Sequence, residues 1–368
     1  MSTPFEFSLT LDRWLHALQV MLEKIKGQPR LDKIRVKIKF GSFNWWRPTW
    51  TWCYVSFLGH RLIHRAEDQQ LLSPLQWESR PNRSSQDAIL MKRLTYDGIC
   101  SNKKFGIIFN NDGKRLWSYG TLPSMGGIAL RRLGASTHAV QTLLITREKM
   151  SYLIRTMMGT SEESYSNLQN WVLGTLQEGS GASPALWLGI TCILLGAISK
   201  KSRRICCFNP ENTRSLSRVV ETYVDDTELM LAVDQGDIFE LAAGMQIIAQ
   251  QWEQLLNTTG AALVLEKCFY MAFDWNFVND QYVLKTKDEL MGLNIALYSG
   301  QNVRVYTLIP QKDPCKGPRN LGAWLAPSGN NIDEMSHLIQ EGRTLSQNIS
   351  ASRLSQHKVM LAYKTILW

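Results

Sequence analysis

The chain has 368 residues, of which 44% are hydrophobic and 20% charged, and its formal net charge is +9 at pH 7. This balance is ordinary for a globular protein, and the length suits one large domain or two to three small ones. The positive charge indicates an anionic partner, for which nucleic acid is the first candidate and a membrane surface the second.

Targeting and metal-binding patterns are weak in this sequence. The N-terminal residues lack a basic segment followed by an apolar one, so no signal peptide is predicted. The seven cysteines form no C-x-x-C pair and no zinc-ligand spacing with the six histidines, which predicts reduced thiols in the nucleus or cytoplasm. The apolar run 185–198 is shorter than the roughly 20 residues that span a bilayer, so we expect a buried core helix and no membrane contact.

The N-terminal part of the chain predicts one helix and one irregular segment. The helix runs from Leu9 to Lys26 and ends near Gly27. Residues 36–57 show no clear period and contain four tryptophans within eight residues, at Trp45, Trp46, Trp50 and Trp52. Such a cluster suits a platform on which bases stack, although no periodicity supports that interpretation.

From Leu62 onward the periodicities predict alternating helices and strands. The expected elements are a helix at 87–96, a buried strand at 105–109, helices at 125–133 and 137–158, an apolar helix at 185–198, a hairpin around 219–233, a helix at 237–256, a strand at 262–265, further strands up to 325 and a final helix from 332. This order favours the α+β class, with an antiparallel sheet and helices packed on one face of it.

The most informative pattern is the pair Asp225-Asp226, which follows Tyr223 and Val224 at the tip of the expected hairpin. Adjacent carboxylates repel each other, and a divalent cation that prefers oxygen ligands, such as Mg²⁺, relieves the repulsion. Two such ions about 4 Å apart stabilise the attacking and leaving oxygens of a phosphoryl displacement, so the box indicates nucleotidyl transfer. The alternative is that both aspartates only form a solvated turn.

Asp112 is a candidate third carboxylate. It stands just past the end of the strand at 105–109, and Asp225 lies at a hairpin tip; these two places can be neighbours in an antiparallel sheet. Together with Asp226 they would form a cluster able to hold two metal ions beside a triphosphate. The alternative for Asp112 is an ordinary Asn-Asn-Asp turn.

Three further segments accompany these carboxylates in the sequence. The loop 177–184 contains glycines that let the backbone approach a ligand, although Ser183 and Pro184 also suit an ordinary helix start. Lys267 suits a general acid or an electrostatic clamp for leaving pyrophosphate, or else a solvated surface position. Residues 320–325 predict a strand with a glycine bend that would grip a primer.

Taken in order, these boxes resemble the reverse transcriptase domain of retroelements, particularly the non-LTR retrotransposon type, over about residues 60–330. The resemblance implies a right-hand polymerase fold, whose expected parts are an N-terminal segment at 1–58, fingers at 59–104, a palm at 105–330 and the start of a truncated thumb at 331–368. It also implies an RNA template, a DNA primer, dNTPs and two Mg²⁺ ions, or Mn²⁺ in their place; no obligate protein partner is indicated. RNA-directed RNA polymerases share the palm but usually carry Gly-Asp-Asp, so they fit less well.

The resemblance also implies roles for single residues. The expected catalytic set is Asp112, Asp225 and Asp226 as metal ligands, with Lys267 at the leaving pyrophosphate. The residues expected to contact the nucleotide or the template are Arg83, Lys92, Arg93, Trp117, Gln177, Gly179, Ser183, Pro184 and Tyr223. Among these, Trp117 would stand where the family has its gate against the ribose 2′-OH.

Three departures from the family pattern favour an alternative, a catalytically inactive remnant that binds nucleic acid through its charge. Ser118 replaces the usual second aspartate, Glu178 interrupts the usual Gln-Gly pair, and most of a thumb is missing after the last palm motif. Residues 36–57 and 114–120 share an unpatterned, Trp-rich sequence, so we hypothesise that both are short out-of-frame islands in a decayed element.

Overall fold

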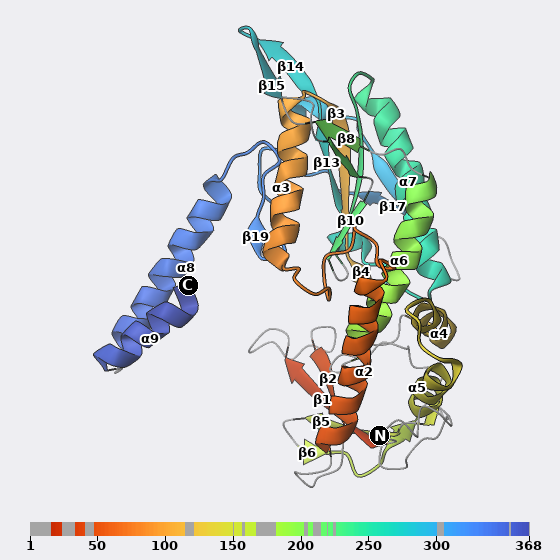
Figure 1. Cartoon of the computed structure of the whole chain (residues 1–368). Coiled ribbons are helices and arrows are strands. Elements are labelled where there is room, and N and C mark those ends of the chain that lie inside the picture. The colour runs from red at the N-terminus through yellow and green to blue at the C-terminus, as the bar shows by residue number, and fades with distance from the viewer. Residues whose placement is uncertain are drawn as a thin grey trace.

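The computed structural model describes residues 16–23, 34–40, 48–114, 121–149, 151–156, 159–166, 182–201, 205–208, 215–218, 220–223, 226–299, 305–352 and 355–367. Its centre is a four-stranded antiparallel sheet, and a second sheet lies beyond one end of it (Figure 1). Two helices at the C-terminal end of the chain extend away from both sheets (Figure 1).

The central sheet has the strand order β10-β11-β3-β13, and every neighbouring pair is antiparallel. The bounds are β3 (Phe105–Asn111), β10 (Val220–Tyr223), β11 (Asp226–Val233) and β13 (Phe269–Phe273). Gly106 allows β11 to approach β3 closely, because a Cβ at this position would lie 3.1 Å from the Cβ of Ala232. Every residue of β3 after Phe105 is buried, as expected for a strand covered on both faces.

One face of this sheet is covered by α6 (Ser183–Lys201) and α7 (Ile238–Thr258). Ile107 of β3 and Leu229 of β11 pack with both helices in the larger hydrophobic core. Trp252 of α7 is fully buried, and its Nε1–H donates to Oδ1 of Asn111 at 3.1 Å. The last residue of β3 is therefore held by a helix that lies under the sheet.

The opposite face is covered by α3 (Ser85–Ser101), which begins with a capping box between Ser84 and Asp87. Tyr96 and Ile99 of this helix pack against Ile108 of β3 in a second core cluster. The predicted α+β class with an antiparallel sheet is confirmed. The prediction that the helices cover one face is wrong, because α3 lies on the side opposite α6 and α7 (Figure 1).

The second sheet has the order β2-β1-β5-β6, and β7 also pairs with β5. The bounds are β1 (His16–Glu23), β2 (Ile34–Phe40), β5 (Ser151–Thr156), β6 (Gly159–Thr160) and β7 (Tyr165–Ser166). One predicted helix is wrong here, and a second is confirmed over Thr137–Lys149 but extends too far. Residues 16–23 of the predicted helix at 9–26 form β1, and the helix predicted over 137–158 ends at Lys149 and gives way to β5. The parallel pairing of β1 with β5 overrides the local helical periodicity in both segments.

Three helices accompany the second sheet: α2 (Pro48–Asp68), α4 (Pro123–Arg132) and α5 (Thr137–Lys149). Leu62, Ile63 and Ala66 of α2 are buried in the larger core together with α6, so this helix is fixed to the body of the central sheet. Strand β2 and helix α2 occupy much of the segment 36–57, for which the sequence predicts no regular element. The side chains of its four tryptophans lie outside the described residues.

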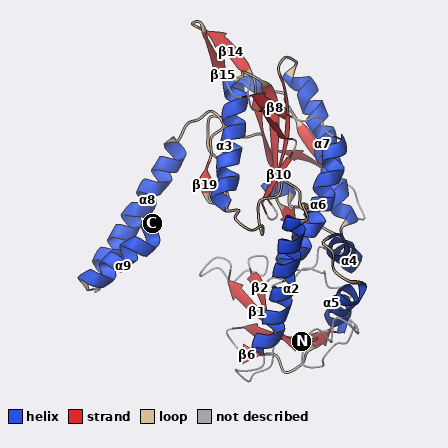
Figure 2. Ribbon diagram, in the orientation of Figure 1, coloured by secondary structure: helices blue, strands red, loops and turns tan. Residues whose placement is uncertain are grey.

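The remaining strands form two-stranded pairs; β14 with β15 is one of them (Figure 2), and all except β4 with β12 are hairpins of consecutive strands. They are the pairs β4 (Gly113–Lys114) with β12 (Ala262–Leu263), β8 (Ile205–Phe208) with β9 (Ser215–Arg218), β14 (Trp275–Val278) with β15 (Gln281–Leu284), β16 (Ile295–Ser299) with β17 (Val305–Ile309), and β18 (Arg319–Asn320) with β19 (Ala323–Trp324). Two 3-10 turns, η3 (Leu265–Lys267) and η4 (Lys287–Leu290), complete this part of the chain.

The C-terminal helices are α8 (Ile332–Ala351) and α9 (Gln356–Leu367). No residue of α8 is buried, and two carboxylates in its first turn attach it to the preceding loop. The N–H of Gly317 donates to Asp333 Oδ2 at 2.7 Å, and the N–H of Trp324 donates to Glu334 Oε2 at 2.6 Å. The helix is thus anchored at one end.

Helix α6 is the one described helix that is long and apolar enough to cross a membrane. Within the window Ser183–Lys200, 67% of the helix is buried inside the protein, and its side chains form part of the larger core. This placement agrees with the buried core helix expected from the apolar run at 185–198.

Candidate catalytic carboxylate site

Asp112 and Asp226 lie at the same end of two adjacent strands. In the ladder between β3 and β11, Asn111 pairs with Thr227, and each following position continues the antiparallel register. Asp112 is the residue after Asn111 and Asp226 the residue before Thr227, so the two aspartates stand opposite each other. The sequence predicts Asp112 beside Asp225 with Asp226 in the same cluster; the structure brings Asp112 and Asp226 together, and Asp225 lies outside the described residues.

Lys267 reaches this end of the sheet because β12 pairs with β4, the short strand that follows Asp112. The N–H of Val264 donates to the carbonyl oxygen of Asp112 at 2.9 Å, and the 3-10 turn η3 then turns the chain back. The Lys267 ammonium forms an ion pair with Oδ2 of Asp112. The Lys267 side chain is 55% exposed and that of Asp112 is 19% exposed, so the pair is accessible from solvent.

The electrostatic setting of Asp226 disfavours its ionised form. Burial is the largest cause that raises the pKa of this carboxyl, and the carboxylates of Asp112 and Glu228 raise it further. The ammonium groups of Lys92 and Lys267 act in the opposite direction and lower the pKa. The end of the sheet thus gathers three carboxylates and two cations that interact with one another.

A buried polar network lies beneath Asp112 and Asp226. Glu228, two residues after Asp226 on β11, is fully buried, and its Oε1 accepts hydrogen bonds from Tyr96 Oη and Asn110 Nδ2, each at 2.9 Å. Lys92 Nζ lies 3.3 Å from the same oxygen, and Asn320 Nδ2 donates to it at 3.4 Å. We call these five residues the Glu228 network.

The Glu228 network connects four parts of the chain. Tyr96 and Lys92 belong to α3, Asn110 to β3, Glu228 to β11 and Asn320 to β18. Because Asn110 precedes Asp112 by two residues and Glu228 follows Asp226 by two, the network fixes the two strands that carry these aspartates. The low dielectric of the buried setting strengthens each of these contacts.

The sequence interpretation missed the network as a site. The sequence contains one signal for it. Asp226 and Glu228 are two positions apart in the largely apolar strand 226–233, so both side chains lie on the same face of the strand. The partners of Glu228 come from segments more than 90 residues distant on both sides, and no local pattern identifies them.

The structure corrects the role expected for Lys92. Its side chain is 1% exposed and is paired with Glu228, so it does not reach the phosphates of a nucleotide or template. Arg93 points to another part of the chain, because its Nη1–H and Nη2–H donate to the carbonyl oxygens of Ala326 and Gly329 and its Nε lies 3.1 Å from Asp97. Neither side chain is placed as the sequence predicts for a phosphate contact.

Two other expected contact residues lie near the site. Arg83 is exposed, and its guanidinium carbon lies 4.6 Å from the centre of the Trp77 ring, which orients the charge beside the start of α3. Tyr223 pairs with Asp226 across the hairpin. Burial raises the pKa of the Tyr223 phenol, Glu78 raises it further, and a hydrogen bond with Ser85 lowers it.

The expected loop residues are only partly described. Ser183 and Pro184 are the first two residues of α6, which agrees with an ordinary helix start. Trp117, Gln177 and Gly179 lie outside the described residues, so their expected roles stay predictions. Asn320 is buried in the Glu228 network, and the next two residues, Leu321 and Gly322, have positive φ values of 51° and 91° that form the tight turn between β18 and β19.

The carboxylates present suit Mg²⁺ by their chemistry. Asp112 and Asp226 supply hard oxygen donors side by side, and the mutual repulsion that raises the pKa of Asp226 is relieved by positive charge. Lys267 supplies such a charge to Asp112. Among the described side chains, no group of three acidic, histidine or cysteine residues could hold a metal ion by itself, and the third expected ligand, Asp225, is outside that set.

No protein-family model matches the chain, and no curated protein matches it. Among solved structures, the chain is similar to apo telomerase from Candida tropicalis truncated from its C-terminal domain, with a TM-score of 0.46 and 10% identity over 75% of this chain and 53% of that one. Telomerase from Candida tropicalis in complex with the TWJ fragment of telomeric RNA has a TM-score of 0.44 and 10% identity over 74% of this chain and 45% of that one.

The corresponding complex from Candida albicans has a TM-score of 0.47 and 12% identity over 96% of this chain and 53% of that one. The chain therefore spans about half the length of these telomerase chains. All three TM-scores are below 0.5, so the proposal that follows rests on the geometry of the carboxylate site and not on this similarity.

Proposed function

We propose that the chain is an RNA-directed DNA polymerase, a reverse transcriptase-type nucleotidyltransferase of the retroelement type that its motif series resembles. The observation that carries the proposal is the position of Asp112 and Asp226, opposite each other at the ends of two adjacent strands. Lys267 forms an ion pair with Asp112 at the same place. Carboxylates with an adjacent lysine suit a site where phosphoryl groups are transferred.

Asp112, Asp225 and Asp226 would hold the divalent cations in this proposal. Two Mg²⁺ ions, when bound, would lower the pKa of a primer 3′-OH and neutralise the triphosphate. The side chains of the protein have two further roles. The Glu228 network keeps the two strands in register. The exposed Lys267 ammonium neutralises negative charge on the departing pyrophosphate or donates a proton to it.

The proposed partners are an RNA template, a DNA primer and dNTPs. Among the fingers residues expected to contact the nucleotide, Arg83 keeps its charge exposed to solvent, and we assign it to a phosphate of the nucleotide or template. The net charge of +9 supports binding to a nucleic-acid backbone without sequence preference. In this proposal residues 59–104 act as fingers, 105–330 as palm and 331–368 as the beginning of a thumb.

A second candidate is a nucleic-acid-binding protein without catalysis. The ion pair between Lys267 and Asp112 favours it, because the lysine neutralises Asp112 without any metal ion. Both candidates bind nucleic acid, so only a measurement of chemistry separates them.

Primer extension on an RNA template tests the proposal. The chain is compared with Asp112→Asn, Asp226→Asn and the matched control Asp288→Asn, an exposed aspartate at η4. We expect the first two variants to lose at least about 100-fold in extension rate, more than the loss of a merely supporting residue, and the control to keep the full rate. No Mg²⁺-dependent extension by the unaltered chain, or equal rates in all four proteins, would reject the polymerase in favour of the binding protein.

A further inference from the structure

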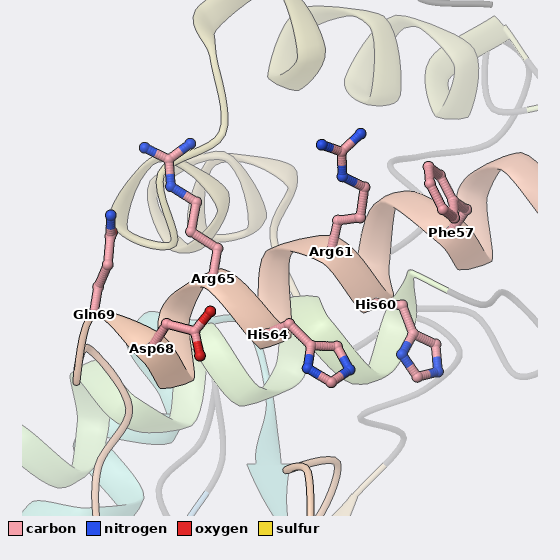
Figure 3. A pocket seen from close by; sticks show the side chains of 7 residues that line it. All are labelled: Phe57, His60, Arg61, His64, Arg65, Asp68 and Gln69. Carbon is pink, nitrogen blue, oxygen red and sulfur yellow. The ribbon is translucent and has the colours of Figure 1, made fainter.

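An open hollow lies on helix α2, away from the carboxylate site. Its volume is about 610 Å³, within the range of about 300–1,000 Å³ that is common for ligand pockets. Figure 3 shows Arg61 and Arg65 extending from one side of the helix and the rings of His60 and His64 from the other. Phe57 lies one turn before Arg61.

The helical period explains why these side chains gather. Phe57, Arg61 and Arg65 are spaced by four residues, and so are His60 and His64, which places each set along one line of the helix. The guanidinium carbon of Arg61 lies 5.5 Å from the centre of the Phe57 ring, and the two imidazoles stack with centroids 5.7 Å apart and planes inclined by 20°. Five exposed planar side chains therefore lie along two neighbouring lines of the helix, with the arginines and Phe57 on one and the histidines on the other.

Among the described residues, the two arginines of this surface outnumber its single carboxylate. Asp68 is the one acidic residue that lines the hollow, and it forms no ion pair with a described residue. In the part of the chain that the structure describes, Arg61 and Arg65 have no carboxylate within ion-pair distance. Two guanidinium groups four residues apart on one helix repel each other, and an anion between them removes that repulsion.

The hollow is fixed relative to the hairpin of β10 and β11. Glu67 of α2 receives two hydrogen bonds from Arg80, and the segment between them pairs with β10 through the N–H of Trp77 and the carbonyl oxygen of Thr222 at 3.1 Å. Thr222 precedes Tyr223, the residue that pairs with Asp226. A ligand held on α2 would thus keep a constant position relative to the carboxylates.

We propose that this hollow binds a single-stranded segment of nucleic acid, with Arg61 and Arg65 on phosphate groups and bases stacked on Phe57 and the imidazoles. Planar side chains beside arginines suit bases and phosphodiesters together. An acidic peptide would use the charges but not the stacking surfaces. A membrane surface would require a continuous apolar face, whereas Leu62, Ile63 and Ala66 of α2 are buried in the core and charged or imidazole side chains occupy most of the hollow. If the proposed function holds, this segment is part of the RNA template; that identification rests on the proposed function, but the binding itself does not.

Binding of a fluorescent single-stranded RNA of about ten nucleotides, followed by anisotropy at several salt concentrations, tests the proposal. We compare Arg61→Gln/Arg65→Gln with Lys287→Gln/Lys316→Gln, which removes the same charge from exposed positions outside α2. The α2 variant is expected to bind at least about tenfold more weakly, with a salt slope smaller by about two, and the control to change less than about twofold.

Further readouts keep the test decisive. Arg61→Gln alone, at an exposed position, replaces the double variant if that variant unfolds, and its expected slope change is about one. Photo-crosslinking with 4-thiouridine RNA is expected to label the peptide that contains Phe57. Equal affinity of the α2 variant and its control, crosslinks confined to other peptides, or binding of acidic peptides or anionic vesicles in place of RNA would overturn the proposal. RNA binding on α2 without primer extension would reject the polymerase alone; extension with unchanged affinity in the α2 variant would reject the α2 site alone.

Discussion

Lys92 and Glu228 form an ion pair inside the protein, with 3.3 Å between Nζ and Oε1 and side chains that are 1% and 0% exposed. The pair joins helix α3 to strand β11 at the face opposite α6 and α7. Such a pair is costly to break on one side only, because the remaining charge stays buried without its partner.

Lys92→Met is therefore expected to lower the free energy of unfolding by about 3–5 kcal/mol, measured by urea denaturation. The double variant Lys92→Met/Glu228→Gln is expected to recover most of this loss, because the neutral amide still accepts hydrogen bonds from Tyr96 and Asn110. Lys287→Met, at an exposed position, serves as the control and should change stability by less than about 0.5 kcal/mol. Equal effects of Lys92→Met and the control would contradict the ion pair.

Lys267→Gln separates a catalytic lysine from a structural one. The ion pair with Asp112 is half exposed on the lysine side, so its loss should change the free energy of unfolding by less than about 1 kcal/mol. If the ammonium acts on the leaving group, primer extension should slow by about 100- to 10,000-fold. A large loss of stability with extension reduced only in proportion to the unfolded fraction would show that Lys267 has a structural role.

Glu67 provides a prediction about pH. Hydrogen bonds from Arg80 hold the pKa of this carboxyl below its usual value of 4.5, so the folded protein binds the proton less tightly than the unfolded chain does. The stability that the ion pair contributes is thus present above pH 4.5 and is lost as the pH falls through the folded-state pKa.

Glu67→Gln is expected to reduce the free energy of unfolding by about 1 kcal/mol near neutral pH, since Glu67 is 31% exposed and partly screened. The difference from the unaltered chain should shrink as the pH is lowered below 4.5. Urea denaturation across this range measures both values. A difference that stays constant with pH would mean that the charge of Glu67 does not contribute.

Gly106→Ala tests the close approach of β3 and β11. The added methyl would lie 3.1 Å from the Cβ of Ala232 and 3.2 Å from the carbonyl oxygen of Leu231, so we expect a loss of about 1–3 kcal/mol. Gly342→Ala is the matched control: this glycine lies inside α8 with no atom near the new Cβ, and the change should stabilise by about 1 kcal/mol. Thermal denaturation measures the melting temperature of both variants. A shift of both melting temperatures in the same direction would contradict the prediction.

Elements with strong local signals could be predicted from the sequence. The helix expected at 237–256 is α7, Ile238–Thr258, because its apolar period and the Asp237 cap agree. The strand expected at 105–109 is β3, and Asp112 follows it as expected. The strand β1 could not be found in the same way, because its conformation depends on pairing with β2 and β5.

The candidate site was predictable to a similar extent. One rule about antiparallel sheets predicted Asp112 beside Asp225, with Asp226 in the same cluster; the structure has Asp112 opposite Asp226, and Asp225 lies outside the described residues. The prediction for Lys92 was wrong because a charged residue on an amphipathic helix is usually exposed, and no local pattern indicates that Glu228 faces it from a distant strand. In the sequence of either segment alone, a charged residue that will be buried against an opposite charge cannot be distinguished from a solvated one, because charged residues are mostly exposed.

Because α8 is anchored by its first turn, a small rotation at that turn displaces the far end of the helix. The helix has 20 residues and is about 30 Å long, so a rotation of about 10° at Asp333 and Glu334 displaces its far end by about 5 Å. The same first turn holds Trp324, which pairs with Arg319 next to Asn320, a partner of Glu228. The contacts from the first turn of α8 to Trp324, and from Asn320 to Glu228, therefore connect this helix to the strand that carries Asp226.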